Sequence, residues 1–236
     1  MYIEEFTSNL FAKGIFGSFT YLIVFIIGLY LSGYYGKYVG LTRSKSYKIY
    51  IYHSLFCCLF AYFSINGIGQ LGDPTHYYSH SLRVHTNNPD GDTSTGTLFI
   101  SYFLSIFTNG LGFDFIASSL IFNIIGSIGM ITFASLIQPY ILLLPGRLSL
   151  LYSILIWSPS LNFWTAMIGK DPITFTAINI AIFSCLRIRS RLLLLLIACA
   201  MMFFARPYLG LIMIASIAIT VFLRSELPSY ITLISR

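Results

Sequence analysis

Three short polar motifs hold the residues of this sequence that are best suited to chemistry. They are Gly72-Asp73-Pro74, Lys170-Asp171-Pro172 and Arg206-Pro207-Tyr208, and each adjoins a long apolar stretch. A carboxylate accepts a proton from a hydroxyl group, and lysine or arginine binds an anionic group through charge-assisted hydrogen bonds. The motifs therefore predict a site that activates a hydroxyl group beside a bound anion.

Asp73 and Asp171 are the candidate catalytic carboxylates, with Asp73 as the better placed of the two. Between Gly72 and Pro74, Asp73 also fits a plain turn in which aspartate bonds its own backbone. An aspartate followed by a proline, as at position 171, is typical of a helix N-cap. The structural and the functional interpretations stay open for both residues.

Lys170, Arg206 and Arg83 are the candidate phosphate-binding cations. Fourteen residues separate Arg206 from Arg191. They span a helical rise of roughly 21 Å at about 1.5 Å per residue, which is less than a hydrocarbon core of roughly 30 Å. One of these two arginines must therefore reach the headgroups or face a wet cavity. Lys170 has a second interpretation as an interfacial anchor.

Aromatic and amide side chains extend the candidate site. Tyr77, Tyr78 and Tyr208 are candidates for stacking on sugar rings, and anchoring at the membrane interface is the alternative for all three. Asn162 follows Ser158-Pro159-Ser160, where proline removes a backbone hydrogen bond and kinks an apolar helix. Because lipid offers an amide no partner, we expect Asn162 to face a cavity.

His76 and His80 are the candidate metal ligands. They are four residues apart and share one face of a helix, which is compatible with a divalent metal site completed by Asp73. Histidines at this spacing also occur without a metal. The sequence therefore requires no cofactor, and a divalent metal stays an alternative.

The composition fixes the class of protein that must position these residues. Apolar residues make up 56% of the chain and charged residues 9%, with a mean hydropathy of +0.79. Soluble domains carry about a quarter charged residues, so a soluble domain is excluded. The sequence predicts an all-α, polytopic transmembrane helical bundle.

The apolar stretches predict about seven crossings in one integral membrane domain over residues 1–236. We expect an extracytoplasmic loop over residues 67–114, in which residues 97–113 form a surface or re-entrant helix. The expected crossings cover residues 15–34, 50–66, 115–137, 148–168, 172–186, 192–205 and 208–223.

Basic residues predict the orientation, because short cytoplasmic loops collect lysine and arginine whereas translocated loops do not. With residues 67–114 outside, ten basic residues are cytoplasmic and four are not. The ten are Lys37, Arg43, Lys45, Lys48, Arg147, Arg187, Arg189, Arg191, Arg224 and Arg236. All three polar motifs then open on the extracytoplasmic face.

The order of the motifs resembles that in bacterial membrane proteins of polysaccharide gene clusters. These are the O-antigen or capsule repeat-unit polymerases and the related GT-C-like glycosyltransferases, which span the membrane several times and use polyprenyl-linked sugars. The resemblance extends from Gly72 to about Leu223, and members are commonly longer, which leaves open that this chain is an N-terminal portion. It rests on Gly72-Asp73, Tyr77-Tyr78, Ser158-Pro159-Ser160, Phe163-Trp164, Gly169-Lys170-Asp171 and Arg206-Pro207-Tyr208.

The resemblance implies transfer of a saccharide from a polyprenyl-diphosphate carrier to a saccharide acceptor, on the outer face of the bacterial inner membrane. The leaving diphosphate needs cations, which Lys170, Arg206 and Arg83 supply. The acceptor hydroxyl needs a base, which Asp73 or Asp171 supplies. Partners would be the lipid-linked saccharide, membrane lipids and polysaccharide-assembly proteins.

Two other classes of function stay open. A transporter or flippase for a lipid-linked or small anionic solute would also place cations in a kinked helical cavity. A noncatalytic membrane subunit would use the outer loop to dock a partner. Nucleic acid is not an expected partner despite the formal charge of +6, because the excess cations lie in short membrane linkers, where anionic lipid is their natural partner.

Overall fold

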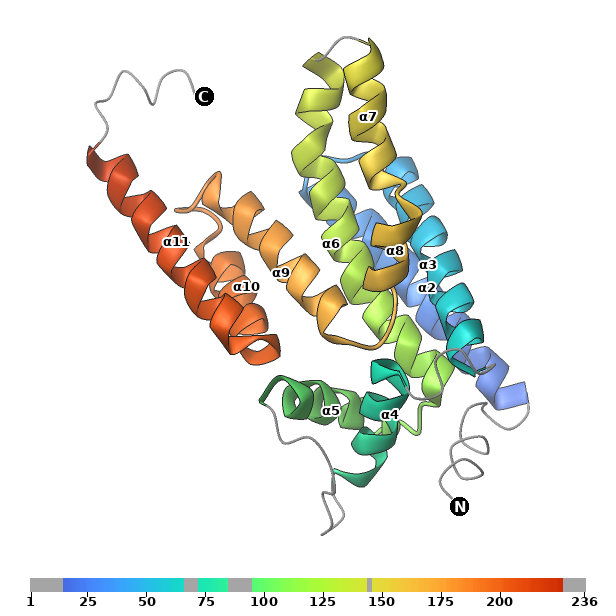
Figure 1. The fold of residues 1–236 in the computed structure, drawn as a ribbon. Coiled ribbons are helices and arrows are strands. Elements are labelled where there is room, and N and C mark those ends of the chain that lie inside the picture. The colour runs from blue at the N-terminus through green and yellow to red at the C-terminus, as the bar shows by residue number, and fades with distance from the viewer. Residues whose placement is uncertain (1–14, 66–71, 85–94, 144–145, 227–236) are drawn as a thin grey trace.

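A computed structural model describes residues 15–65, 72–84, 95–143 and 146–226 of the chain (Figure 1). Every regular element in these ranges is an α-helix, which confirms the predicted all-α class. The helices are α2 (Ile15–Tyr38), α3 (Arg43–Ile65), α4 (Asp73–Arg83), α5 (Thr95–Thr108), α6 (Phe115–Leu143), α7 (Gly146–Ile156), α8 (Pro159–Thr165), α9 (Lys170–Cys185), α10 (Leu192–Ala205) and α11 (Pro207–Glu226).

Three helices in the described ranges are long and apolar enough to cross a membrane. They cover Phe19–Tyr38, Arg43–Ile65 and Phe115–Ile141, which lie in α2, α3 and α6. Shorter apolar helical stretches cover Thr95–Thr108, Leu192–Ala205 and Pro207–Phe222, which lie in α5, α10 and α11. The chain is therefore a helical membrane protein, and the other four expected crossings stay predictions.

The expected crossing over residues 148–168 is divided into two helices, α7 and α8. Pro159 begins α8 and lacks an N–H, and its ring keeps the preceding residue out of the helical conformation. Ser158 accordingly has an extended backbone, with φ −59° and ψ 119°. The sequence predicted a kink here, and the structure has a break.

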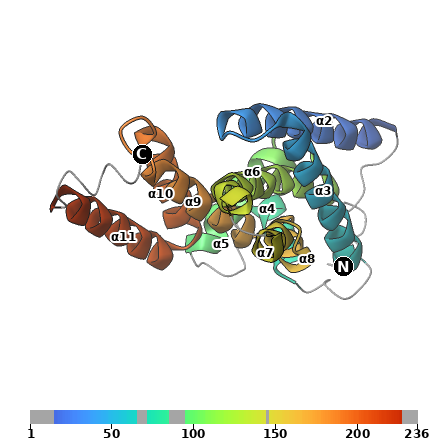
Figure 2. The same ribbon diagram turned by 90° about the horizontal axis from the view of Figure 1, so that it is seen from above.

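Helix α6 is the centre of the arrangement. It packs against α2 and α3 on one side and against α9 on the other, and α10 and α11 continue outward from α9 (Figure 2). Gly126 faces the backbone of Thr165, and Gly129 faces α9. A Cβ added at Gly126 would collide with the Thr165 carbonyl oxygen, and one added at Gly129 would collide with Thr176. Small residues of this kind let membrane helices approach closely.

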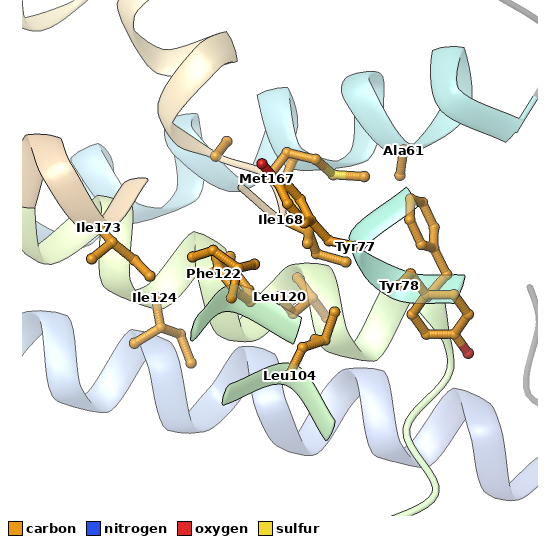
Figure 3. Packing of buried hydrophobic residues seen from close by; sticks show 14 of the residues in the cluster. Ala61, Tyr77, Tyr78, Leu104, Leu120, Phe122, Ile124, Met167, Ile168 and Ile173 are labelled. Carbon is orange, nitrogen blue, oxygen red and sulfur yellow. The ribbon is translucent and has the colours of Figure 1, made fainter. Parts of the chain in front are cut away.

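Two short helices, α4 and α5, lie across one end of the bundle (Figure 1). Their apolar side chains join a buried cluster that includes Tyr77 and Leu104, together with Phe122 of α6 and the Met167–Ile168 segment before α9. Figure 3 shows how these side chains meet. This core holds the polar ends of several helices in fixed relation to one another.

The opposite end of the bundle carries most of the described basic residues. There α2 ends and α3 begins, α6 ends and α7 begins, and α9 ends and α10 begins (Figure 1). Seven of the ten residues expected to be cytoplasmic lie at this end with described side chains: Lys37, Arg43, Lys45, Lys48, Arg187, Arg189 and Arg191. Arg236 lies outside the described residues.

Candidate functional site

A cavity of about 690 Å³ lies at the end of the bundle that α4 and α5 cover. All three polar motifs of the sequence contribute to its wall. Its lining residues are Phe60, Asp73, Pro74, Tyr77, Thr95, Gly96, Trp164, Met167, Ile168, Gly169, Lys170, Asp171, Pro172, Ala205, Arg206, Pro207 and Tyr208. Residues that are more than 130 positions apart in the sequence are therefore neighbours around one space.

Four of the described helices begin at this cavity. The first residues of α4, α5, α9 and α11 all line it. A helix N-terminus presents unpaired backbone N–H groups and the positive end of the helix dipole. Four such ends around one space favour an anionic ligand.

Lys170 is the first residue of α9. Its Nζ atom donates a hydrogen bond to Thr97 Oγ1 at 3.2 Å and lies 5.9 Å from the centroid of the Tyr77 ring. Both partners are neutral, so neither cancels the ammonium charge. Gly96 makes this arrangement possible, because a Cβ there would collide with the Ala205 carbonyl oxygen and lie 3.2 Å from Lys170 Cε.

Arg206 reaches the cavity because Pro207 ends helix α10. A residue before proline is restricted to extended conformations, and Arg206 has φ −146° and ψ 87°. Its Nη2 atom donates to Asp171 Oδ1 at 2.6 Å, in an ion pair whose side chains are 32% and 49% exposed. An ion pair this exposed contributes little stability, at most about 1 kcal/mol.

The expected N-cap role of Asp171 is wrong. The N-cap of α9 is Gly169 and makes no side-chain capping bond, so Asp171 lies one residue inside the helix. Its carboxylate binds Arg206 of the next helical hairpin instead. A carboxylate in the first helical turn still interacts favourably with the helix dipole.

Asp73 lines the cavity from the first turn of α4, with an exposed side chain. A plain turn was one of the two interpretations that the sequence left open for Asp73, but the residue begins a helix. Gly72 is the N-cap with an extended backbone, and Pro74 supplies the fixed φ that suits a first turn. Thr75 Oγ1 donates to the Gly72 carbonyl oxygen at 2.8 Å.

Aromatic side chains form part of the wall. Tyr77 is buried beside Lys170, whereas Tyr208 is exposed at the start of α11. Trp164 and Phe60 also line the cavity, with ring centroids 5.9 Å apart. The cavity therefore combines charged groups with ring faces, which suits a ligand that has both an anionic group and an apolar or saccharide face.

Tyr78 lies outside the cavity. Its ring packs edge-on against Phe115 at 5.4 Å in the buried cluster. Burial raises the pKa of the Tyr78 phenol, and the nearby Asp114 carboxylate and Tyr21 add to this shift. Tyr78 therefore attaches α4 to the start of α6 rather than facing the cavity.

Asn162 and Arg83 also lie away from the cavity wall. Asn162 is buried, and its Nδ2 atom donates to the carbonyl oxygens of Ile156 and Ser158, at 3.1 and 2.9 Å. These bonds join α8 to the end of α7 across the break. Arg83 is the last residue of α4, and its Nε atom donates to Ser79 O at 3.3 Å.

The candidate metal ligands stack on one another. The rings of His76 and His80 are 6.3 Å apart, His76 is exposed and His80 is buried. In the part of the chain that the structure describes, no group of three or more His, Cys, Asp or Glu residues could hold a metal ion. A metal site with these two histidines stays a prediction.

Sequence reasoning missed several wall residues. Trp164 entered only as part of the Phe163-Trp164 motif, with no role in the site, and nothing in the sequence singled out Phe60 or Thr95. One signal was present: a charged residue stands directly before proline in Asp73-Pro74, Asp171-Pro172 and Arg206-Pro207. Each pair marks a helix start at the cavity.

Comparison with protein-family models, with curated proteins and with solved structures finds no match to this chain.

Proposed function

We propose that the chain is a membrane glycosyltransferase of the polysaccharide polymerase type. It transfers a saccharide from a polyprenyl-diphosphate carrier to a saccharide acceptor in surface polysaccharide synthesis. The observation that carries the proposal is the cavity itself, where Asp73, Lys170 and Arg206 meet at the beginnings of four described helices. A base, two cations and oriented backbone N–H groups are the parts that this transfer needs.

The proposed setting is a multi-pass protein of the bacterial inner membrane with about seven crossings and the cavity on the extracytoplasmic side. The basic end of the bundle then faces the cytoplasm, in agreement with the charge rule for short loops. Helix α9 has 16 residues and α10 has 14, so they rise only roughly 21–24 Å at about 1.5 Å per residue. A cavity at their ends lies close to the headgroup level, where a lipid diphosphate resides.

Stabilisation of the leaving diphosphate is the first task of the site. As the bond between the anomeric carbon and the phosphate oxygen breaks, the diphosphate takes the electron pair and gains negative charge. Lys170 supplies a cation whose two neighbours are neutral, and Arg206 supplies a second. The four helix N-termini add partial positive charge that needs no reorientation during the reaction.

Activation of the acceptor is the second task. The acceptor hydroxyl oxygen forms a bond to the anomeric carbon and gives its proton to a carboxylate. Asp73 suits this role, because Asp171 already binds Arg206 at 2.6 Å. Tyr77, Tyr208 and Trp164 offer ring faces on which saccharide units can stack.

Alanine replacement at the cavity tests the proposal. Asp73→Ala, Lys170→Ala and Arg206→Ala are each produced in a host that lacks its own polymerase, and long-chain surface polysaccharide is measured with protein abundance. Lys48→Ala and Arg187→Ala, at exposed positions of the basic end, are the matched controls. We expect the cavity variants to lose long-chain product at normal abundance and the controls to retain it.

Retained product in the Asp73 and Lys170 variants would overturn the enzymatic proposal and favour a noncatalytic subunit. A transporter gives a third pattern. In that case the cavity variants accumulate unpolymerised lipid-linked saccharide on the cytoplasmic leaflet instead of the outer one.

A further inference from the structure

A buried polar network crosses the bundle directly behind the cavity wall. His53 of α3 is fully buried, with Nδ1 2.6 Å from Asn123 Oδ1 of α6 and Nε2 3.1 Å from Thr165 Oγ1 of α8. Asn123 Nδ2 donates to Ser54 Oγ at 2.8 Å, and Ser54 donates to the Tyr50 carbonyl oxygen. We call His53, Asn123 and Thr165 the polar clamp.

The donors and acceptors of the polar clamp can be assigned from its chemistry. The Asn123 Oδ1 atom only accepts, so His53 Nδ1 carries the hydrogen. In the neutral ring, Nε2 is then an acceptor, and the Thr165 hydroxyl donates to it. The same hydroxyl lies 2.7 Å from the Leu161 carbonyl oxygen, but its single proton serves one acceptor at a time.

Gly126 of α6 brings the three helices close enough for these bonds. A Cβ at this position would lie 2.9 Å from His53 Cε1 and would collide with the Thr165 carbonyl oxygen. The polar clamp therefore depends on close backbone contact as well as on polar groups. Polar side chains inside a membrane bundle are costly to bury, so a fully buried set of them requires a reason.

That reason lies in the position of Thr165 along the chain. Thr165 is the last residue of α8, it directly follows the cavity residue Trp164, and the segment from 166 to 169 leads directly to Lys170. Met167 and Ile168 of this segment line the cavity as well. Fixing Thr165 from behind thus fixes the start of this part of the wall, next to Trp164.

We propose that His53 and Thr165 are positioning residues, which hold the segment from Trp164 to Lys170 and so place the Trp164 ring and the Lys170 ammonium in the cavity. This inference deepens the proposed function, because it concerns the same cavity. Neither residue lines that cavity. Their effect on a ligand is therefore indirect.

The two tryptophans of the chain allow a direct test. In a Trp157→Phe background, Trp164 is the only tryptophan, so its fluorescence anisotropy and its quenching by acrylamide report on this wall. Farnesyl diphosphate is the binding probe. The variants are Thr165→Val, the conservative Thr165→Ser, and His53→Gln, which keeps one donor and one acceptor.

Thr132→Val is the matched control. Thr132 is buried, its hydroxyl lies 2.9 Å from the Tyr35 hydroxyl, and it bonds the carbonyl oxygen four residues earlier at 2.7 Å, as Thr165 does. It belongs to α6 and does not line the cavity. The control therefore removes an equivalent buried hydroxyl from another part of the bundle.

We expect Thr165→Val to lower the Trp164 anisotropy, to increase its quenching and to weaken probe binding by about tenfold, as for one buried hydrogen bond. Thr165→Ser and His53→Gln should retain most of the parent's Trp164 immobility and most of its affinity for the probe. Thr132→Val should change neither the Trp164 signals nor the affinity. Equal behaviour of Thr165→Val and Thr132→Val, or failure of Thr165→Ser to restore, would overturn the inference. If the parent protein binds no probe, the proposed function fails, and the Trp164 mobility still decides the inference.

Discussion

The two ends of helix α9 show how basic side chains serve different purposes. At the C-terminal end, Arg191 donates to the Phe183 carbonyl oxygen at 2.7 Å and lies 3.6 Å from the Phe183 ring centroid. At the N-terminal end, Lys170 begins the helix, and its Nζ atom donates to the neutral Thr97 hydroxyl and lies 5.9 Å from the centroid of the neutral Tyr77 ring. The Arg191 guanidinium at the C-terminal end agrees with the dipole of α9, whereas the Lys170 ammonium at the N-terminal end opposes it.

This difference separates structural cations from candidate functional ones. Arg191 donates to a carbonyl oxygen in the last turn of α9, where a cation also agrees with the helix dipole, so it has a structural role. Lys170 is placed where its charge is unfavourable for the helix, and it lines a cavity that would offset this cost when an anion binds. The position of a cation relative to a helix end therefore indicates its role better than its residue type does.

The rate of saccharide transfer should depend strongly on Asp73, the proposed base in the cavity. We expect Asp73→Asn to lower the rate of the proposed saccharide transfer by about a thousandfold, because the amide cannot accept the hydroxyl proton. Affinity for the diphosphate donor should stay the same or rise, since a negative charge is lost. Initial rates and donor binding measured on the same purified variant check this, and an equal loss of both would assign Asp73 to binding.

Loss of the opposing cation should separate activity from stability. We expect Lys170→Met to lower transfer by about a hundredfold, while resistance to thermal unfolding stays equal or rises by about 0.5 kcal/mol, because a charge that opposes the dipole is removed. Thermal unfolding in detergent and transfer rates provide the comparison. A large loss of stability would show that Lys170 is a structural residue.

At the basic end, loss of a cation should instead lower stability and leave transfer unchanged. Arg191→Met removes a charged hydrogen bond and a ring contact at the end of α9, so we expect stability to fall by about 1 kcal/mol. Transfer by the folded fraction should be unchanged, because this end is remote from the cavity. The comparison of the two helix ends breaks down if transfer falls more than the folded fraction does.

The ion pair within the cavity should give the smallest effect. Asp171→Asn frees Arg206 from a partly exposed partner, so stability should change by less than about 0.5 kcal/mol. Diphosphate affinity should rise by about threefold, since the site loses a negative charge. If transfer instead falls as far as it does for Asp73→Asn, then Asp171 is the base.

The sequence predicted the parts of this site that depend on local rules. Composition indicated a helical membrane protein, and the three polar motifs that the sequence singled out line one cavity in the structure. Local rules do not say which way a side chain faces. Tyr78 and Asn162 therefore turned out to pack inside the protein.

Other features depend on contacts between distant segments. The Asp171 carboxylate binds Arg206 from the next hairpin, which its own sequence context, typical of a helix cap, could not reveal. The polar clamp joins His53 to Thr165 across three helices, and each of its members looks unremarkable in the sequence alone. Only the tertiary packing shows these relations.

Equilibrium binding of a long-chain prenyl diphosphate to the purified protein tests the central claim most directly. We predict saturable binding that Lys170→Met weakens by about tenfold or more, that Arg191→Met leaves unchanged, and that an uncharged prenyl alcohol does not compete for. Equal binding by the parent protein and the Lys170→Met variant, or full competition by the alcohol, would contradict the account, because the cavity would then not be recognising the diphosphate.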